Sequence, residues 1–359
     1  MFEDLGDYIN ELPDKVNLKF MDITNTYGPT IKCLKKSLKN KDCFSFWLKI
    51  ILFLTNKFNQ KFLFFAKFLF KFKTKYDCAI AFRVGFCAEV VAHCVNANQK
   101  YVWWHHGECN YNNNERYKMA NIFNYFDQVV AVSNGCKEMI ENYFGNLNNK
   151  VIVIPNMIDT DEINKKAIFF NPYENENFNI VTVGRLSPEK NIICIVEIVK
   201  ELIKSGFYDF RWHIVGNGSE FEKIKIEIEK NKLNNHIILK GEKNNPYPYI
   251  KNADIMVHPS LVESQCLTVL EALALSKPCI VSESIGPKEF ILNGINGILT
   301  SHSPKDIAYE IINLINNEEL YNKIELNALK TIESKYSVKN IIGKIENLLA
   351  NGGINICQK

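Results

Sequence analysis

Two glutamates eight positions apart, Glu263 and Glu271, are the residues of this chain best suited to chemistry. The apolar residues 253–258 predict a short buried strand before them, and the Leu- and Ala-rich run after Ser264 predicts a helix. A helix that begins at the carboxyl end of a parallel strand presents free backbone N–H groups that bind anions. A carboxylate beside such a site can accept hydrogen bonds from two neighbouring hydroxyls. The pattern favours a ligand with phosphate and hydroxyl groups, although two solvated surface glutamates remain the alternative.

A second strand-to-helix junction carries two cations. An apolar strand ends at Gly184, Arg185 and Lys190 follow it, and residues 192–203 have helical periodicity. Arginine binds phosphate through two N–H groups at once, and lysine binds it as a point charge. This junction therefore also indicates phosphate binding, with ordinary surface charge as the alternative.

Composition indicates a globular enzyme. The chain has 359 residues, of which 47% are hydrophobic and 23% are charged, and its net charge of +3 does not indicate a nucleic-acid-binding protein. Its eleven cysteines contain no C-x2-C pair, which favours reduced thiols in a cytoplasm over a zinc site or disulfides. Residues 1–16 are acidic and lack the apolar core of a signal peptide.

Apolar strands alternate with helical runs along the chain, which predicts an α/β fold with one parallel sheet in each half. A polar, Asn-rich break precedes the restart of this pattern at Ile180. We therefore expect a first domain over residues 1–160, a linker over 161–177, a second domain over 178–335 and a C-terminal helix in 336–359, with a return of that helix to the first domain as one option. The predicted strands lie at residues 78–82, 100–104, 128–132, 151–154, 180–183, 211–215, 236–239, 254–258, 279–282 and 298–299.

In their order and spacing, these motifs resemble the retaining family-4 glycosyltransferases of the GT-B fold, also called glycosyl transferases group 1. The resemblance covers residues 76–350 and rests on many blocks, each of which is weak alone. The matched blocks are Gly184-Arg185-Leu186-Ser187-Pro188-Glu189-Lys190, Gly216-Asn217-Gly218, Asn245-Pro246-Tyr247, the pair Glu263 and Glu271, Ser276-Lys277-Pro278, Gly286-Pro287 and Asn293-Gly294-Ile295-Asn296-Gly297.

The resemblance implies two Rossmann-like domains facing a cleft and the transfer of a sugar, with retention, from a nucleotide diphosphate sugar. A UDP-sugar is the preferred donor, and a glycan or lipid-linked molecule is the acceptor, in the biosynthesis of bacterial surface polysaccharide, glycolipid or glycoprotein. The leaving phosphate would accept the acceptor's proton, since no separate nucleophile stands out. The implied catalytic residues are His106, Arg185, Lys190 and Glu263, and the implied donor-binding residues are Gly184, Arg185, Lys190, Glu263, Cys266, Leu267, Thr268 and Glu271.

In these assignments Glu271 holds the ribose hydroxyls and Glu263 holds the hydroxyls of the transferred sugar. The triplet Asp159-Thr160-Asp161 is a D-x-D pattern that binds metal in other glycosyltransferase architectures. Here it follows a block that the resembled family also carries, and Arg185 and Lys190 can balance the diphosphate charge. We therefore expect no catalytic metal and no cofactor.

Residues 32–75 contain twelve lysines and one acidic residue, interleaved with many aromatic side chains. A basic, aromatic, amphipathic segment is typical of attachment to an anionic membrane surface. A helix pair packed on the first domain, with its lysines in water, is an equal alternative. The expected location is cytoplasmic, with peripheral attachment to the inner face of the cytoplasmic membrane as an option.

Two departures from the family keep other functions open. The given sequence shows neither the family's usual first β-α-β unit nor its Gly-Gly-x-Glu loop, so that either the true start lies upstream or the first domain is short. In addition, Gln265-Cys266-Leu267 stands where many members have Phe-Gly followed by a hydrophobic residue. One alternative is a non-catalytic nucleotide-sugar-binding protein or subunit. Another is a GT-B nucleotide-sugar epimerase, which would need further acid and base residues.

Overall fold

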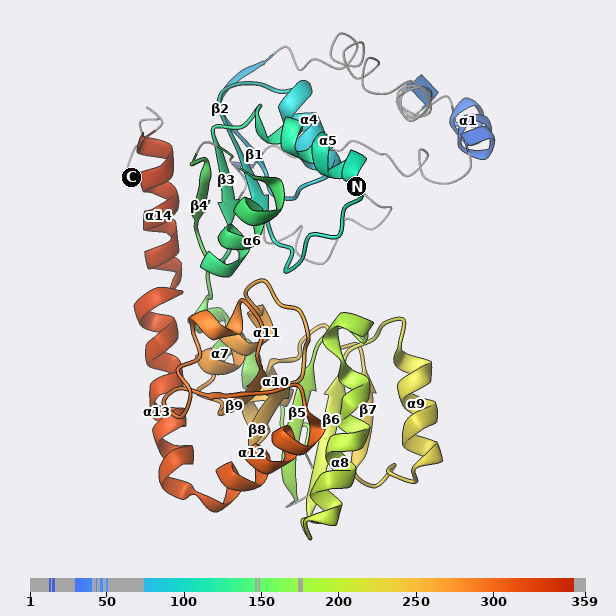
Figure 1. Ribbon diagram of the computed structural model, residues 1–359, viewed down its shortest axis with the longest axis vertical. Helices are drawn as coiled ribbons and strands as arrows, with labels where there is room; N and C mark the ends of the chain where they lie inside the picture. The colour runs from blue at the N-terminus through green and yellow to red at the C-terminus, as the bar shows by residue number, and fades with distance from the viewer. Residues whose placement is uncertain are drawn as a thin grey trace. The chain divides into compact units, whose positions relative to one another are not determined.

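The computed structural model describes residues 13, 15–16, 30–40, 43, 46–47, 50, 74–145, 147, 149–173 and 177–351. The chain divides into two compact units. Residues 1–76 and 89–98 form one unit, and residues 77–88 and 99–359 form the other. The second unit contains all the predicted site residues, from His106 to Glu271, and Figure 1 labels its helices and strands.

The described part of the first unit consists of α1 (Thr30–Lys39), most of α4 (Phe86–His93) and the adjoining ends of two strands. The α1 helix ends with Lys36 and Lys39 in its last turn. Most of the basic aromatic segment 32–75 lies outside the described residues, so its proposed membrane contact stays a prediction. Within the described part of the chain, no helix is long and apolar enough to cross a membrane.

A four-stranded sheet has the order β1-β2-β3-β4, and β3 runs parallel to both β2 and β4. Its inner strands are rich in Val, Ala and aromatic residues, and Trp103, Trp104, Val129 and Val130 are buried. Strands of this composition are expected where a parallel sheet is covered on both faces. Its strands and their following helices are β1 (Lys75–Ala81), β2 (Asn96–Trp104), α5 (Asn113–Phe123), β3 (Gln128–Ala131), α6 (Asn134–Phe144) and β4 (Val151–Val153).

A six-stranded parallel sheet has the order β10-β9-β8-β5-β6-β7. The order reverses direction between β5 and β8, and ligands bind beyond the carboxyl ends of the strands at such a switch point. Its strands are β5 (Phe178–Val183), β6 (Phe210–Val215), β7 (Ile237–Gly241), β8 (Ile255–His258), β9 (Cys279–Ser282) and β10 (Ile298–Thr300). Its helices are α7 (Thr160–Ala167), α8 (Ile195–Lys204), α9 (Phe221–Lys230), α10 (Tyr247–Asn252), α11 (Leu267–Ala274), α12 (Pro304–Asn316), α13 (Glu318–Lys335) and α14 (Val338–Asn351).

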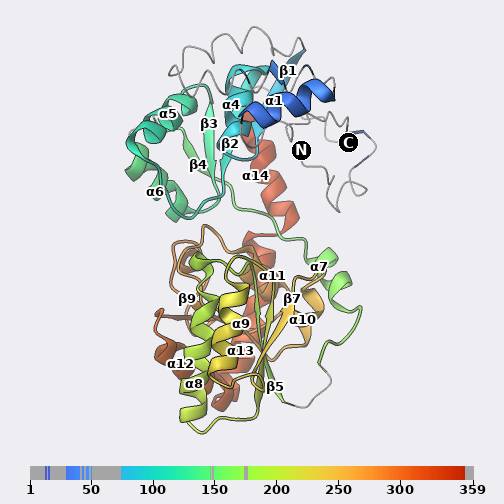
Figure 2. The ribbon, with the colours of Figure 1, turned by 90° about the vertical axis from the view of Figure 1, so that its right-hand side faces the viewer.

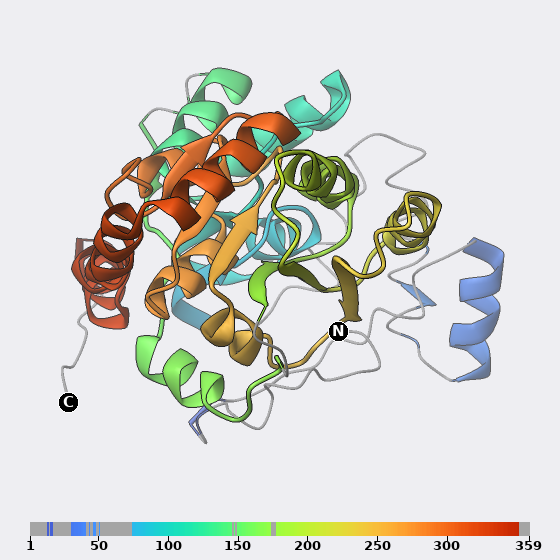
Figure 3. The same cartoon turned by 90° about the horizontal axis from the view of Figure 1, so that it is seen from below.

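Successive residues of the six strands enter two separate cores, because side chains alternate between the faces of a sheet. Ile180, Trp212 and Ile255 pack with α8, α9 and α12. Val181 and Met256 pack with α7, α10 and α11 on the opposite face. The strands lie between these two layers, as the views in Figure 2 and Figure 3 show. Burial on both faces fixes the register of the strands, and with it the positions of the loops at their carboxyl ends.

All ten strands predicted from the apolar runs are present, with ends shifted by up to four residues. The helix predicted over 192–203 begins later: two 3-10 turns, Pro188–Lys190 and Ile192–Cys194, precede α8. Asn191 between these turns has the positive φ of 51°. The predicted linker 161–177 begins with the last seven residues of α7, whose Ile163 and Ala167 are buried in the core.

The last helix reaches the four-stranded sheet. Tyr101 on β2 donates a hydrogen bond from its hydroxyl to the carbonyl oxygen of Leu348 on α14, at 3.4 Å. Between α13 and α14, the N–H of Ile158 donates to the carbonyl oxygen of Tyr336 at 2.8 Å. The C-terminal segment that follows the six-stranded sheet is thus hydrogen-bonded at two points, to β2 and to the residues after β4.

Candidate active site

Glu263 is the centre of a buried, charged group of side chains. Its Oε1 accepts a hydrogen bond from Lys190 Nζ at 2.5 Å and another from His258 Nε2 at 2.7 Å. The carboxylate is 7% exposed and His258 is 4% exposed, so these contacts are shielded from water. The alternative of a solvated loop residue is therefore wrong for Glu263, and the two predicted motifs contact each other through the ion pair between Lys190 and Glu263.

The pairing of adjacent strands explains why Lys190 and Glu263 meet. Strand β5 lies next to β8, so the loops that follow these strands leave the sheet side by side. The loops are then joined by the N–H of Leu261 and the hydroxyl of Ser260, which both donate to the carbonyl oxygen of Glu189, at 2.9 and 3.0 Å. Lys190 follows directly, and its ammonium group reaches Glu263.

The surroundings of Glu263 keep it ionised. Burial alone would raise the pKa of this carboxyl group, because desolvation disfavours the charged form. The hydrogen bond from His258 and the ammonium group of Lys190 outweigh this effect and lower the pKa to about 2. A carboxylate held in this state can only accept hydrogen bonds, which suits the recognition of substrate hydroxyls.

Gly184 and Arg185 line a pocket of about 350 Å³ beyond the carboxyl ends of β5 and β6. Gly216 also lines it, with φ of 146°, and a Cβ atom at this position would overlap the carbonyl of Gly184. Arg185 is exposed, and Lys243 adds a second cation to the pocket wall, beside the carboxylate of Glu242. Two cations against one carboxylate leave the pocket with net positive charge and close backbone, which suits a phosphate-bearing ligand.

Glu271 lies about one turn into α11, which begins at Leu267. Its Oε1 accepts a hydrogen bond from the hydroxyl of Tyr247 at 3.3 Å, and Tyr247 follows Pro246 of the pocket wall. Burial raises the pKa of Glu271 to about 7, and the bond from Tyr247 opposes this shift. Glu271 is thus a partly buried carboxyl group near the pocket, not a solvated helix residue.

Cys266, Leu267 and Thr268 form the N-terminus of α11, where free backbone N–H groups are expected. Cys266 caps the helix with φ of 65° and ψ of 72°, in the left-handed region that favours glycine. This is the position where many members of the resembled family carry glycine. The buried cysteine therefore adopts a backbone conformation that usually requires glycine, at a steric cost.

The loop around His106 touches the backbone of the Glu263 loop. A Cβ atom at Gly107 would lie 2.9 Å from the carbonyl carbon of Glu263, so only glycine fits this contact. Ser264 Oγ also donates to the carbonyl oxygen of His105 at 2.8 Å. The imidazole of His106 is exposed, and partial burial followed by the charge of Arg83 lowers its pKa. The loop of His106 thus lies against the backbone of the Glu263 loop, and within the described residues no hydrogen bond joins the imidazole to Glu263.

Two further contacts fix the loop that carries Glu263. Ser133 Oγ donates to the carbonyl oxygen of Ser264 at 2.7 Å and accepts from the N–H of Cys136, so Ser133 caps α6. Gln265 Oε1 accepts from the backbone and side-chain nitrogens of Asn156, at 2.8 and 2.7 Å. These hydrogen bonds explain why a buried glutamine occupies the position where many members of the resembled family carry phenylalanine.

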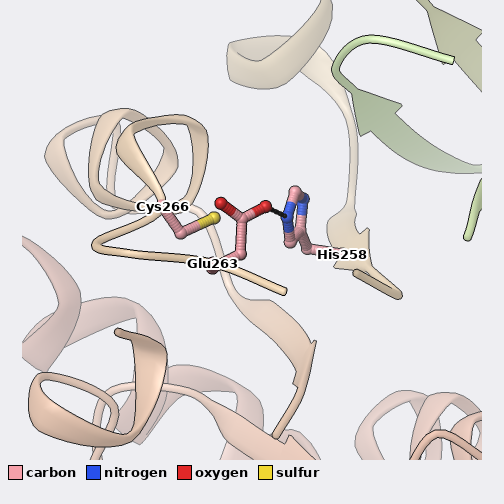
Figure 4. A group of neighbouring side chains, drawn as sticks. All are labelled: His258, Glu263 and Cys266. Carbon is pink, nitrogen blue, oxygen red and sulfur yellow. Dashed lines mark hydrogen bonds and ion pairs between the residues drawn. The ribbon is translucent and has the colours of Figure 1, made fainter. Parts of the chain in front are cut away.

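His258, Glu263 and Cys266 could offer a nitrogen, an oxygen and a sulfur ligand to a metal ion, because these atoms lie within 4.8 Å of one another. Figure 4 shows the three side chains converging, with the bond between His258 and Glu263 dashed. However, burial raises the pKa of Cys266, and the ammonium group of Lys190 already contacts Glu263. A cation at this position would have to displace that ammonium group.

The D-x-D triplet has a different function in the structure. Asp159 Oδ1 accepts a hydrogen bond from the N–H of Glu162 at 2.9 Å and so caps α7. Such an N-cap satisfies one of the free N–H groups at a helix start.

Neither His258 nor Tyr247 was predicted from the sequence to belong to the site. His258 ends a run of buried apolar residues, where a histidine is easily taken for a core residue. The sequence feature that could have identified it is its position at the carboxyl end of a predicted strand, five residues before Glu263. Tyr247 was part of a matched block, and only folding brings it to Glu271.

Two parallel α/β sheets with a charged pocket beyond the carboxyl ends of the strands are an arrangement typical of proteins that bind nucleotides. Residues 47–162 match the model of Glycosyltransferase Family 4, and residues 164–331 match that of Glycosyl transferases group 1. The chain therefore belongs to this family of glycosyltransferases, with the GT-B fold.

Relatives of known activity support the family. The poly(ribitol-phosphate) alpha-N-acetylglucosaminyltransferase of Staphylococcus aureus is 29% identical over 67% of this chain and 51% of its own length. An Escherichia coli UDP-Gal:alpha-D-GlcNAc-diphosphoundecaprenol alpha-1,3-galactosyltransferase is 27% identical over 57% of this chain and 55% of its own. The structure of S. aureus TarM with fondaparinux, alpha-GlcNAc-glycerol and UDP has a TM-score of 0.60 and 25% identity, covering 72% of this chain and 51% of that one. The chain spans about half the length of these relatives.

Proposed function

We propose that this chain transfers a sugar, with retention of its anomeric configuration, from a UDP-sugar to a glycan or lipid-linked acceptor. The observation that carries the proposal is the ion pair between Lys190 and Glu263, formed by the loops that follow β5 and β8, while Gly184 and Arg185 of the same β5 loop line the pocket. It supplies an acceptor for sugar hydroxyls and a cation for phosphate at one place. The UDP in the TarM structure and the activities of the relatives support this choice of donor and of acceptor class.

In the proposed complex, Arg185 and the N–H groups of Cys266, Leu267 and Thr268 bind the diphosphate. Lys190 has three N–H donors, of which Glu263 takes one, so the others remain for a phosphate oxygen. As the bond between the sugar and the phosphate breaks, negative charge grows on the leaving diphosphate. Fixed cations and N–H groups stabilise such charge, which is usually the largest contribution to catalysis.

The sugar would be held by Glu263, and the ribose by Glu271. The acceptor hydroxyl attacks from the face that the diphosphate leaves, and a phosphate oxygen takes its proton. His106 is placed to orient the sugar or acceptor, since its loop contacts the Glu263 backbone. This scheme uses no metal ion and no cofactor, and we propose that none is needed.

The test is release of nucleoside diphosphate from UDP-, GDP- and ADP-sugars in the presence of EDTA, with and without lipid-linked acceptors. The proposal expects release from a UDP-sugar, and NMR of the product should show the donor's anomeric configuration. Inversion would refute retention. Binding of UDP without any release or transfer would favour the non-catalytic alternative, and a new UDP-sugar without transfer would favour the epimerase.

A further inference from the structure

His258 belongs to the site by contact, yet the proposed function gives it no part. It is the last residue of β8, and it pairs with Val281 on β9 and is 4% exposed. Its Nδ1 is buried without a hydrogen-bond partner within the described residues. The ring proton therefore belongs on Nε2, where it is donated to Glu263.

Lys190 and His258 bond to the same oxygen of Glu263. Both hydrogen bonds end at Oε1, and none among the described residues reaches Oε2. Figure 4 shows this second oxygen on the side of the carboxylate away from His258, toward the sulfur of Cys266. One oxygen is thus used for positioning, while the other keeps its full capacity to accept hydrogen bonds from a ligand.

The two donors differ in how firmly they are held. Lys190 has a flexible side chain that is 21% exposed and comes from a loop of 3-10 turns. His258 comes from an inner strand between β5 and β9, and its ring has only two rotatable bonds. If Lys190 moves toward a phosphate, only His258 continues to hold the carboxylate in place.

We propose that His258 is a positioning residue: it fixes Glu263 so that Oε2 faces the hydroxyls of the transferred sugar, while Lys190 is shared with the diphosphate. This inference rests on the proposed function and adds to it. It predicts that His258 matters for the sugar part of the donor and little for the nucleotide part. A merely structural histidine would affect both parts alike, through the stability of the domain.

The experiment compares three variants of the full chain: His258→Leu, His258→Gln and His213→Leu. Glutamine can present an amide N–H at about the place of Nε2, whereas leucine cannot donate. His213 is the matched control, because it is also 4% exposed, lies on inner strand β6 and donates or accepts one side-chain hydrogen bond, with Asn179 at 3.0 Å. Thermal unfolding establishes that each variant is folded.

Two quantities are measured for each variant in EDTA: the Kd for UDP by calorimetry, and kcat and KM for UDP release. The donor is whichever of UDP-glucose, UDP-galactose and UDP-N-acetylglucosamine the wild type cleaves fastest. A hydrogen bond to a charged group is worth about 1.5–3 kcal/mol, so His258→Leu should lower kcat/KM about 10- to 100-fold. The Kd for UDP should change less than about threefold, which corresponds to under about 1 kcal/mol of binding free energy.

His258→Gln should recover a large part of the lost kcat/KM. In His213→Leu, the ratio of kcat/KM to UDP affinity should stay as it is in the wild type. Unchanged kcat/KM in a folded His258→Leu variant would overturn the inference, as would an equal loss of UDP affinity. A wild type that neither binds UDP nor cleaves any donor would overturn the proposed function itself.

Discussion

At the scale of single residues, Lys190 balances the charge of Glu263 in the structure and is proposed to bind the diphosphate. Lys190→Ala should therefore lower turnover by about 10²- to 10³-fold, the usual effect of removing one group that stabilises developing charge. The variant should fold but melt at a lower temperature, because a buried carboxylate loses its cation. Turnover and thermal unfolding measure the two effects.

A double variant separates these two effects. Lys190→Ala combined with Glu263→Gln removes the unpaired charge, so it should recover stability while turnover stays low. Lys200→Ala is the matched control, since Lys200 pairs with Glu197 on the surface of α8 at 2.7 Å. Near-normal turnover of Lys190→Ala would contradict the assignment of Lys190.

Glu271 makes a prediction about pH. Its pKa is raised to about 7, so the carboxyl group is largely protonated at pH 6 and largely ionised at pH 8. Ribose hydroxyls donate hydrogen bonds, and the ionised carboxylate is the better acceptor. Affinity for UDP should therefore rise as the pH increases from 6 to 8. The measurement is calorimetry of wild type and Glu271→Gln across this range.

The Gln variant controls for the phosphate of UDP, which titrates in the same range. The difference in binding free energy between wild type and Glu271→Gln should grow with pH. A difference that stays constant from pH 6 to 8 would remove Glu271 from the ribose site.

At the scale of elements, the site depends on loops that leave neighbouring strands. Gly216 begins the loop after β6, and its absent Cβ leaves room for the Gly184 carbonyl. Gly216→Ala should therefore distort the pocket, lower the melting temperature and weaken UDP binding. Gly343→Ala is the matched control on α14, where a Cβ would meet nothing within 4 Å. It should instead stabilise the protein by about 0.5–1 kcal/mol, as alanine does within helices. Equal effects of both substitutions on UDP binding would contradict this account.

The sequence predicted the strands well because their Val and Ile runs are long, buried and bounded by polar loops. It predicted the start of α8 less well, because the turns around Asn191 follow from contacts with the loop after β8. For example, Asn191 Nδ2 donates to the carbonyl oxygen of Pro259 at 3.3 Å. Glu263 was found from its motif, whereas its partner His258 depends on side-chain geometry across a loop. Burial of Glu271 likewise arises only when α10 and α11 pack.

At the scale of the whole molecule, both sheets contribute to the site. Glu289 follows β9 and accepts hydrogen bonds from the N–H and side-chain amide of Asn134, at 2.9 and 3.1 Å, at the start of α6. Glu289→Gln should weaken these bonds, because the carboxylate at a helix N-terminus also gains from the helix dipole. We expect a loss of about 0.5–1 kcal/mol in the free energy of unfolding, measured by denaturant titration, with UDP binding retained. A stability equal to wild type would show that this contact contributes nothing in solution.

The central claim is that the site at the six-stranded sheet binds a nucleoside diphosphate through protein groups alone. The most direct measurement is calorimetric titration of the chain with UDP in EDTA, beside GDP and ADP, and repeated with Glu271→Ala. The account predicts a micromolar Kd for UDP that weakens strongly in the variant. A folded chain that binds none of the three nucleotides, or that binds UDP equally well without Glu271, would contradict it.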